Sequence, residues 1–150
     1  MADRATEETQ MELTGQCLCG ALRYKSTGTP VRRFVCHCRD CQRSSGSAFH
    51  VGLTVPRDGF TLTGEVRVYR SKGASGRNVA RYFCPTCGSG VFNEIELRPG
   101  LVALKVGTLD EPARVSPSYE LFARSKMPWV SLGDIERFAE MTPAGHQPKP

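Results

Sequence analysis

Apolar and polar residues alternate along most of the chain, with the period of two that is typical of β-strands. The clearest example is the segment AFHVGLTV, residues 48–55, which is predicted to be a half-buried strand. Its apolar face carries Phe49, Val51, Leu53 and Val55, while His50 and Thr54 fall on the opposite face. Similar patterns predict strands at 21–26, 60–64, 66–71, 78–84, 90–96 and 101–109, separated by Gly, Pro and Asp turn signals.

Helical patterning is sparse and predicts one or two short helices. One is expected at about residues 39–44, where the carboxylate of Asp40 is expected to act as the cap. The other is expected near the end of the chain, where Asp134 can cap a stripe of Ile135, Phe138 and Met141. The fold class predicted from these patterns is mostly β, an antiparallel β-sheet domain.

Length and composition indicate one domain. The chain has 150 residues, and we expect a single β domain over 12–142, a disordered lead-in over 1–11 and a disordered tail over 143–150. The start, MADRATEETQ, is polar and lacks the apolar core of a secretory signal, and no apolar run approaches the ~20 residues of a membrane span. We therefore expect a cytoplasmic protein, in which clustered cysteines more often bind metal than form disulfides.

Seven cysteines occur in three groups along the chain. They are Cys17-x-Cys19, Cys36-x-Cys38-x-x-Cys41 and Cys84-x-x-Cys87. Structural disulfides fit poorly, because seven is odd and a C-x-C pair is too close for a relaxed bridge. Zinc, which takes four ligands tetrahedrally, fits better. The net charge of +5 permits nucleic-acid binding, although the basic residues can equally balance thiolates and attract an acidic substrate.

The spacing of the cysteines divides them between two ions. Cys36, Cys38 and Cys41 are close enough in sequence for one ion to collect all three. The two distant pairs, Cys17/Cys19 and Cys84/Cys87, can then meet at a second ion. Four thiolates close that site, which is expected to be structural and to staple the β domain.

The three-cysteine group is one ligand short, and two interpretations stay open. A histidine could close it as a second structural site, with His37, His50 and His146 as the candidates. His37 lies between two ligands and is expected to point away from the ion, and His146 lies in the tail. Alternatively, the fourth position is open to a substrate, as in catalytic zinc sites with three protein ligands.

The cysteine groups and their surroundings resemble the glutathione-dependent formaldehyde-activating enzymes, whose domain also occurs in centromere protein V. The resemblance rests on GQCLCGALRY, CHCRDCQRSSGSAF, YFCPTCGSGVF, VGTLDEP and SYELFARSKMPWV, and spans roughly residues 14–140. It implies a mostly β fold with two zinc ions per chain. A structural zinc is implied at Cys17, Cys19, Cys84 and Cys87, and a catalytic zinc at Cys36, Cys38 and Cys41.

The resemblance also implies an activity, a carbon-sulfur lyase resembling S-(hydroxymethyl)glutathione synthase. Such an enzyme adds a thiol, with glutathione as co-substrate, to formaldehyde or another small aldehyde, and would serve aldehyde detoxification. Glutathione carries two carboxylates, so basic residues near the metal are expected to bind it. Arg39 and Arg43, which flank Cys41, are the nearest candidates for substrate binding.

Two other functions are compatible with the cysteine pattern. A non-catalytic zinc module would bind protein or nucleic acid, and it predicts a contiguous basic face and four protein ligands on both ions. A methionine sulfoxide reductase of the R type would need a free, reactive cysteine. Seven ligands on two ions leave no cysteine for that role.

Overall fold

The computed structural model describes residues 12–143, so the expected lead-in and nearly all of the expected tail lie outside the described residues. Within this range the chain forms eleven strands and one α-helix, α1 (Arg39–Ser45). The strands are β1 (Leu13–Gln16), β2 (Arg23–Ser26), β3 (Arg32–Cys36), β4 (His50–Pro56), β5 (Phe60–Thr63), β6 (Arg67–Lys72), β7 (Asn78–Phe83), β8 (Gly90–Ile95), β9 (Leu101–Lys105), β10 (Tyr119–Leu121) and β11 (Glu136–Arg137). Short 3-10 turns cover Val106–Thr108, Pro112–Arg114 and Ala123–Ser125. The mostly β fold class is thereby confirmed.

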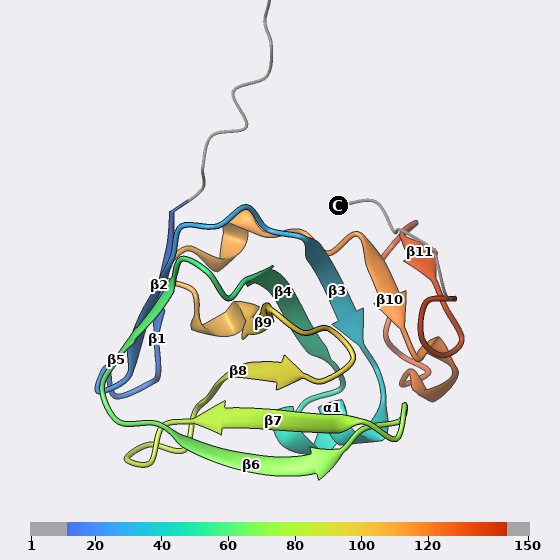
Figure 1. Ribbon diagram of the computed structural model, residues 1–150. Helices are drawn as coiled ribbons and strands as arrows, with labels where there is room; N and C mark the ends of the chain where they lie inside the picture. Colours follow the sequence, from blue (N-terminus) through green and yellow to red (C-terminus); the bar gives the residue numbers. More distant parts are fainter. Residues whose placement is uncertain (1–11, 144–150) are drawn as a thin grey trace, which may run out of the picture.

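The strands form two sheets. The smaller one has the order β1-β2-β5, and the larger one has the order β11-β10-β3-β4-β9-β8-β7-β6. Figure 1 shows the large sheet curling from β10 and β11 on the right, through β3 and β4, to β6 and β7 at the bottom. Neighbouring strands are antiparallel except at one edge, where β10 runs parallel to both β3 and β11. The predicted antiparallel sheet is therefore confirmed, with parallel pairing at this one edge.

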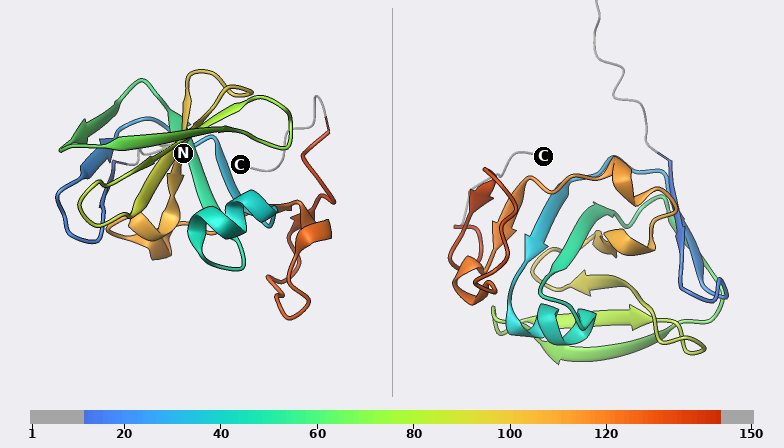
Figure 2. Two further views of the ribbon diagram at one scale, coloured as in Figure 1. Left: turned by 90° about the horizontal axis from the view of Figure 1, so that it is seen from below. Right: turned by 180° about the vertical axis from the view of Figure 1, so that it is seen from behind.

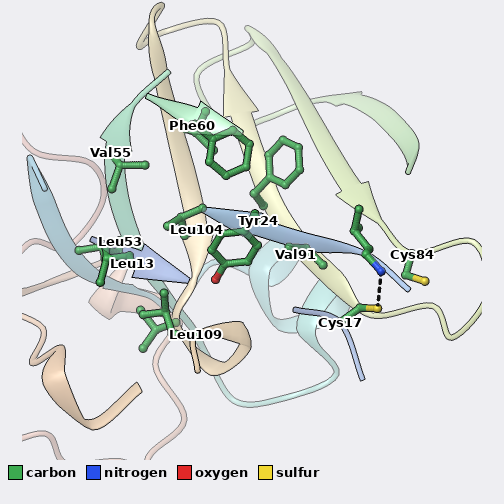
Figure 3. Close-up of a cluster of buried hydrophobic side chains, with 14 residues drawn as sticks. Leu13, Cys17, Tyr24, Leu53, Val55, Phe60, Cys84, Val91, Leu104 and Leu109 are labelled. Carbon is green, nitrogen blue, oxygen red and sulfur yellow. Dashed lines mark hydrogen bonds between the residues drawn. The ribbon is translucent and has the colours of Figure 1, made fainter. Parts of the chain in front are cut away.

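One face of the large sheet packs against the small sheet and forms the hydrophobic core. Strands β4 and β9 contribute Leu53, Val55, Val102 and Leu104, which meet side chains of β1, β2 and β5. Leu13, Tyr24 and Phe60 come from those three strands, and Figure 3 shows several of these side chains gathered in one layer. The period of two explains this arrangement, because alternate residues of β4 and β9 point to the same face.

The other face of the large sheet is also covered, which corrects the prediction of a half-buried strand at residues 48–55. His50 and Thr54 are only 5% and 4% exposed. They point away from the core, into a cavity that the curled sheet encloses together with the loop from β3 to β4. Helix α1 lies on that loop, and Figure 2 shows it beneath the large sheet in the left-hand view. The short helix expected at 39–44 is thus confirmed.

The helix expected near the end of the chain is wrong, because this segment pairs with the edge of the large sheet. Glu136–Arg137 forms strand β11 beside β10. The Phe138 amide donates to the Glu120 carbonyl at 2.9 Å, and the Ala123 amide donates to the Phe138 carbonyl at 3.0 Å. A helix of two turns is marginal in water, whereas the edge of β10 offers unpaired backbone groups.

Candidate metal centre

The four-cysteine group brings together segments that lie far apart in the chain. Cys17 and Cys19 follow β1, and Cys84 and Cys87 follow β7. All four sulfur atoms lie within 4.8 Å of one another. The Cys17 and Cys19 sulfurs are 3.6 Å apart, and the Cys19 and Cys84 sulfurs are 3.8 Å apart. A tetrahedral zinc with Zn–S bonds of ~2.3 Å requires sulfur separations of about 3.8 Å, so the group fits such an ion.

The surroundings of this group suit thiolate ligands. The Leu22 amide lies 3.3 Å from the Cys17 sulfur, a contact drawn in Figure 3, and the Ser89 hydroxyl lies 3.2 Å from the Cys87 sulfur. Gly88 directly follows the turn that carries Cys84 and Cys87. It has a φ of 77°, a conformation that glycine adopts without strain. Because Cys17 leads from the small sheet and Cys84 from the large one, an ion here would tie the two sheets together.

The three-cysteine group lies where β3 passes into α1. Cys36 is the last residue of β3, Cys38 is the N-cap of α1, and Cys41 is in the first turn. The three sulfur atoms lie within 4.8 Å of one another. The Cys41 amide donates to the Cys38 sulfur at 3.3 Å. The expectation that Asp40 caps this helix is therefore wrong, because the Cys38 sulfur occupies the capping position.

Contacts among the three sulfurs favour a thiolate on Cys38. Hydrogen bonds from Cys36 and then Cys41 lower the pKa of the Cys38 thiol to about 2. The same contact with Cys38 raises the pKa of Cys36. A thiolate at Cys38 would attract a cation to the group.

His37 is turned away from the sulfurs, as expected from its place between two ligands. Its Nε2 lies 2.8 Å from Oε1 of Glu120 on β10, and both side chains are fully buried. Arg137 of β11 donates from Nε to the other carboxylate oxygen of Glu120 at 2.6 Å. His37 is thus held by a hydrogen-bond network that links the cysteine loop to the C-terminal segment.

His50 also lies outside the group. It pairs in register with Cys36 across β3 and β4, yet its ring nitrogens do not join the three clustered sulfurs. Burial, reinforced by the nearby Lys105, lowers the pKa of His50 to about 3, so the ring is neutral at physiological pH. His146 lies outside the described residues. Within 12–143, the group consists of three cysteines with no histidine among them.

A cavity of about 190 Å³ opens beside the three cysteines. Its floor is the face of the large sheet opposite the core, and its walls include Phe34, Leu121 and Phe122. Two polar atoms on the floor, Nε2 of His50 and Oδ1 of Asn93, are buried without a hydrogen-bond partner among the described residues. Buried polar atoms are normally paired, so these two are placed to meet a ligand.

The arginines that border the cavity differ from those expected. Arg39 and Arg43 lie on α1, where Arg39 donates to Gln42, and neither is among the described residues that line the cavity. The lining instead includes Arg32, Arg81 and Arg98, which come from β3, β7 and the turn after β8. Sequence proximity to the cysteines could not reveal them. The sequence does give a signal for Arg32. Positions four apart in a strand share a face, so Arg32 is expected on the same face as Cys36.

These features define a mostly β protein with two cysteine groups that could each hold a metal ion, one of them bordering a cavity. The chain belongs to the family of glutathione-dependent formaldehyde-activating enzymes, since the family model with that description matches residues 12–125. This agrees with the resemblance found in the cysteine motifs.

Two further comparisons concern curated proteins and solved structures. No match was found among curated proteins. The crystal structure of a Rhodobacter sphaeroides protein is similar in fold, with a TM-score of 0.53 and 16% sequence identity. The similarity covers 83% of this chain and 99% of the other. In the described part of the chain, no helix has the length and apolar character needed to cross a bilayer.

Proposed function

We propose that this protein is a zinc-dependent carbon-sulfur lyase that adds a thiol, glutathione in the first instance, to formaldehyde or another small aldehyde. The observation that carries the proposal is the three-cysteine group, which is one protein ligand short and borders a cavity. Membership of the family supports the same chemistry. The four-cysteine group, which has a full ligand set, serves as the structural site.

Cys36, Cys38 and Cys41 would hold the second zinc ion. With an open position, an ion held there would supply Lewis-acid chemistry that lowers the pKa of an incoming thiol, so that a thiolate would be available as the nucleophile. The reaction then forms one C–S bond and opens the C=O double bond, and the carbonyl oxygen takes up a proton. The reverse reaction breaks the same C–S bond and releases the aldehyde.

The chain's own residues position the reactants and limit the access of water. Cys38 caps the start of α1 and so ties the ligand loop to the helix. Phe34, Leu121 and Phe122 give the cavity apolar walls beside the cysteines. The neutral ring of His50 and the amide of Asn93 offer hydrogen-bonding atoms on the floor, where the aldehyde oxygen becomes a hydroxyl.

The remaining features of the proposal follow from this chemistry. The partners are a small-molecule thiol and a small aldehyde, and the cofactors are two Zn²⁺ ions per chain. We place the enzyme in the cytoplasm, where glutathione is available and cysteines stay reduced. Arg39 and Arg43 stay candidates for a substrate contact outside the cavity, because both are on the helix that carries Cys41.

Magnetization-exchange NMR tests the activity, since formaldehyde and glutathione also combine without a catalyst. The zinc-loaded protein is expected to accelerate exchange between free glutathione and S-(hydroxymethyl)glutathione, and Cys38→Ser is expected to abolish the acceleration. Exchange at the buffer rate in the presence of fully loaded wild-type protein would refute the proposed activity.

A further inference from the structure

Three arginines border the cavity without a carboxylate to balance them. Arg32, Arg81 and Arg98 form no ion pair within the described residues, although the molecule pairs Arg57, Arg114, Arg124 and Arg137 with glutamates. Asp40 is the one acidic residue among the described residues of the lining. The part of the lining away from Asp40 and the cysteines therefore carries positive charge, which is suited to an anionic ligand.

Arg32, Arg98 and Tyr119 all border the cavity. Nη1 of Arg32 donates a long hydrogen bond of 3.4 Å to the hydroxyl of Tyr119. Arg98 borders the same cavity, where burial, followed by the repulsion of Arg32, lowers the pKa of its guanidinium. Two guanidinium groups and a phenol hydroxyl provide several hydrogen-bond donors and no negative charge. This combination binds a carboxylate well.

Arg32 lies at the opposite end of β3 from Cys36, one of the three clustered cysteines. Arg32 begins β3 and Cys36 ends it, with Phe34 between them on the same face. Their Cα atoms are therefore about 13 Å apart, from a rise of roughly 3.3 Å per residue. A tripeptide spans up to about 10 Å, and the arginine side chains reach part of the remaining distance. A thiol held at the cysteines can thus extend a carboxylate to Arg32.

We propose that Arg32, Arg98 and Tyr119 form a carboxylate-binding subsite that selects thiols bearing a carboxylate at the distance found in glutathione. The inference rests on the proposed function, whose thiol substrate it specifies. Arg81 is less suited to this role, because its guanidinium donates to Ser71 at 2.7 Å and is already engaged. The anion belongs to the thiol in this account, since formaldehyde carries no charge.

Titration with S-methylglutathione tests the subsite without relying on catalysis, because this probe keeps both carboxylates and cannot donate a thiolate. We expect the zinc-loaded wild type to bind it, and Arg98→Gln and Arg32→Gln each to raise its Kd about tenfold or more. Arg98→Lys should retain part of the affinity. The matched control is Arg67→Gln on β6, an exposed arginine outside the cavity lining, which should bind like the wild type.

The exchange assay supplies the second arm and separates the two hypotheses. With glutathione, Arg98→Gln should raise KM about tenfold with little change in kcat, whereas with 2-mercaptoethanol, which has no carboxylate, KM should match the wild type. If the wild type is inactive but S-methylglutathione binding depends on Arg98, the subsite stands and the proposed activity fails. If the wild type is active and both arginine variants leave glutathione affinity unchanged, the subsite is refuted.

A carboxylate on the aldehyde is the alternative source of the anion. In that case Arg98→Gln would weaken the use of glyoxylate, an aldehyde that carries a carboxylate, and would leave S-methylglutathione binding unchanged. That outcome would overturn the assignment of the subsite to the thiol. Thermal unfolding of each variant, expected to match the wild type because both arginines are only partly buried, excludes misfolding as the cause.

Discussion

The imidazole of His37 and the carboxylate of Glu120 form a fully buried contact, with 2.8 Å between Nε2 and Oε1. It joins the loop that carries the three cysteines to β10, beside a backbone hydrogen bond of 3.0 Å from the His37 amide to the Leu121 carbonyl. Glu120 also accepts from Arg137, so the loop is anchored through one carboxylate to the C-terminal segment. The two neighbours of His37, Cys36 and Cys38, are positioned by this anchor.

Replacing Glu120 with alanine is predicted to destabilise the protein and loosen the second metal site. Loss of the carboxylate leaves the fully buried ring of His37 without its hydrogen-bond partner, which typically costs about 1–3 kcal/mol. Urea unfolding of the zinc-loaded protein measures the stability, and competition with a chelator measures the affinity of the more weakly held zinc. The conservative change Glu120→Gln should retain more of both.

The exposed pair of Glu111 and Arg114, 2.8 Å apart, provides the control for this prediction. Glu111→Ala is expected to cost less than about 1 kcal/mol, because surface ion pairs contribute little. Equal effects of Glu111→Ala and Glu120→Ala would show that the His37–Glu120 contact has no special role.

The two cysteine groups are predicted to respond differently to loss of one ligand. Cys87→Ser should unfold the domain or leave it strongly destabilised, because that group ties the two sheets together. Cys38→Ser should remove about one zinc per chain, abolish activity and largely keep the fold. Zinc analysis with circular dichroism checks both variants, and indistinguishable behaviour would contradict the division into a structural and a catalytic site.

Replacing Gly52 with alanine is predicted to reshape the cavity. A Cβ at this position on β4 would overlap the ring of Phe34, which lines the cavity next to Cys36. The ring must move, so we expect a stability loss of about 1–3 kcal/mol and a clear rise in the KM for glutathione. Gly107→Ala is the control, because no heavy atom lies within 4 Å of a Cβ built there. A wild-type KM in Gly52→Ala would argue against binding along β3.

His50 is predicted to be dispensable for metal binding. Its ring lies outside the clustered sulfurs, so His50→Gln should still bind two zinc ions per chain. The exchange rate should nevertheless fall, because an unpaired ring nitrogen on the cavity floor is removed. Loss of one zinc in this variant would instead identify His50 as the fourth ligand of the second site.

Sequence patterns predict much of this arrangement, and the exceptions have physical causes. The spacing of the cysteines predicts their two groups, because three cysteines close in sequence can share one ion and the two distant pairs are then left for the other. The period of two predicts seven strands, including β4 with Leu53 on its core face. The same period could not show that a curled sheet would bury the opposite face around His50.

Contacts between distant segments account for the other differences between the predicted and the observed structure. Pairing with the edge of β10 replaces the helix expected around Phe138, and no local pattern reports the presence of that edge. Arg98 reaches the cavity from a turn more than fifty residues beyond Cys41. The cap of α1 is Cys38 rather than Asp40, because a clustered sulfur accepts the amide hydrogen bond.

X-ray absorption at the zinc edge, recorded with and without glutathione, tests the central claim most directly. Four cysteines on one ion and three on the other predict an average of about 3.5 sulfur atoms per zinc, with no imidazole nitrogen. Glutathione is expected to raise the average to about 4, as its sulfur fills the open position. An imidazole nitrogen in the free protein, or an average that glutathione leaves unchanged, would contradict an open, thiol-binding site.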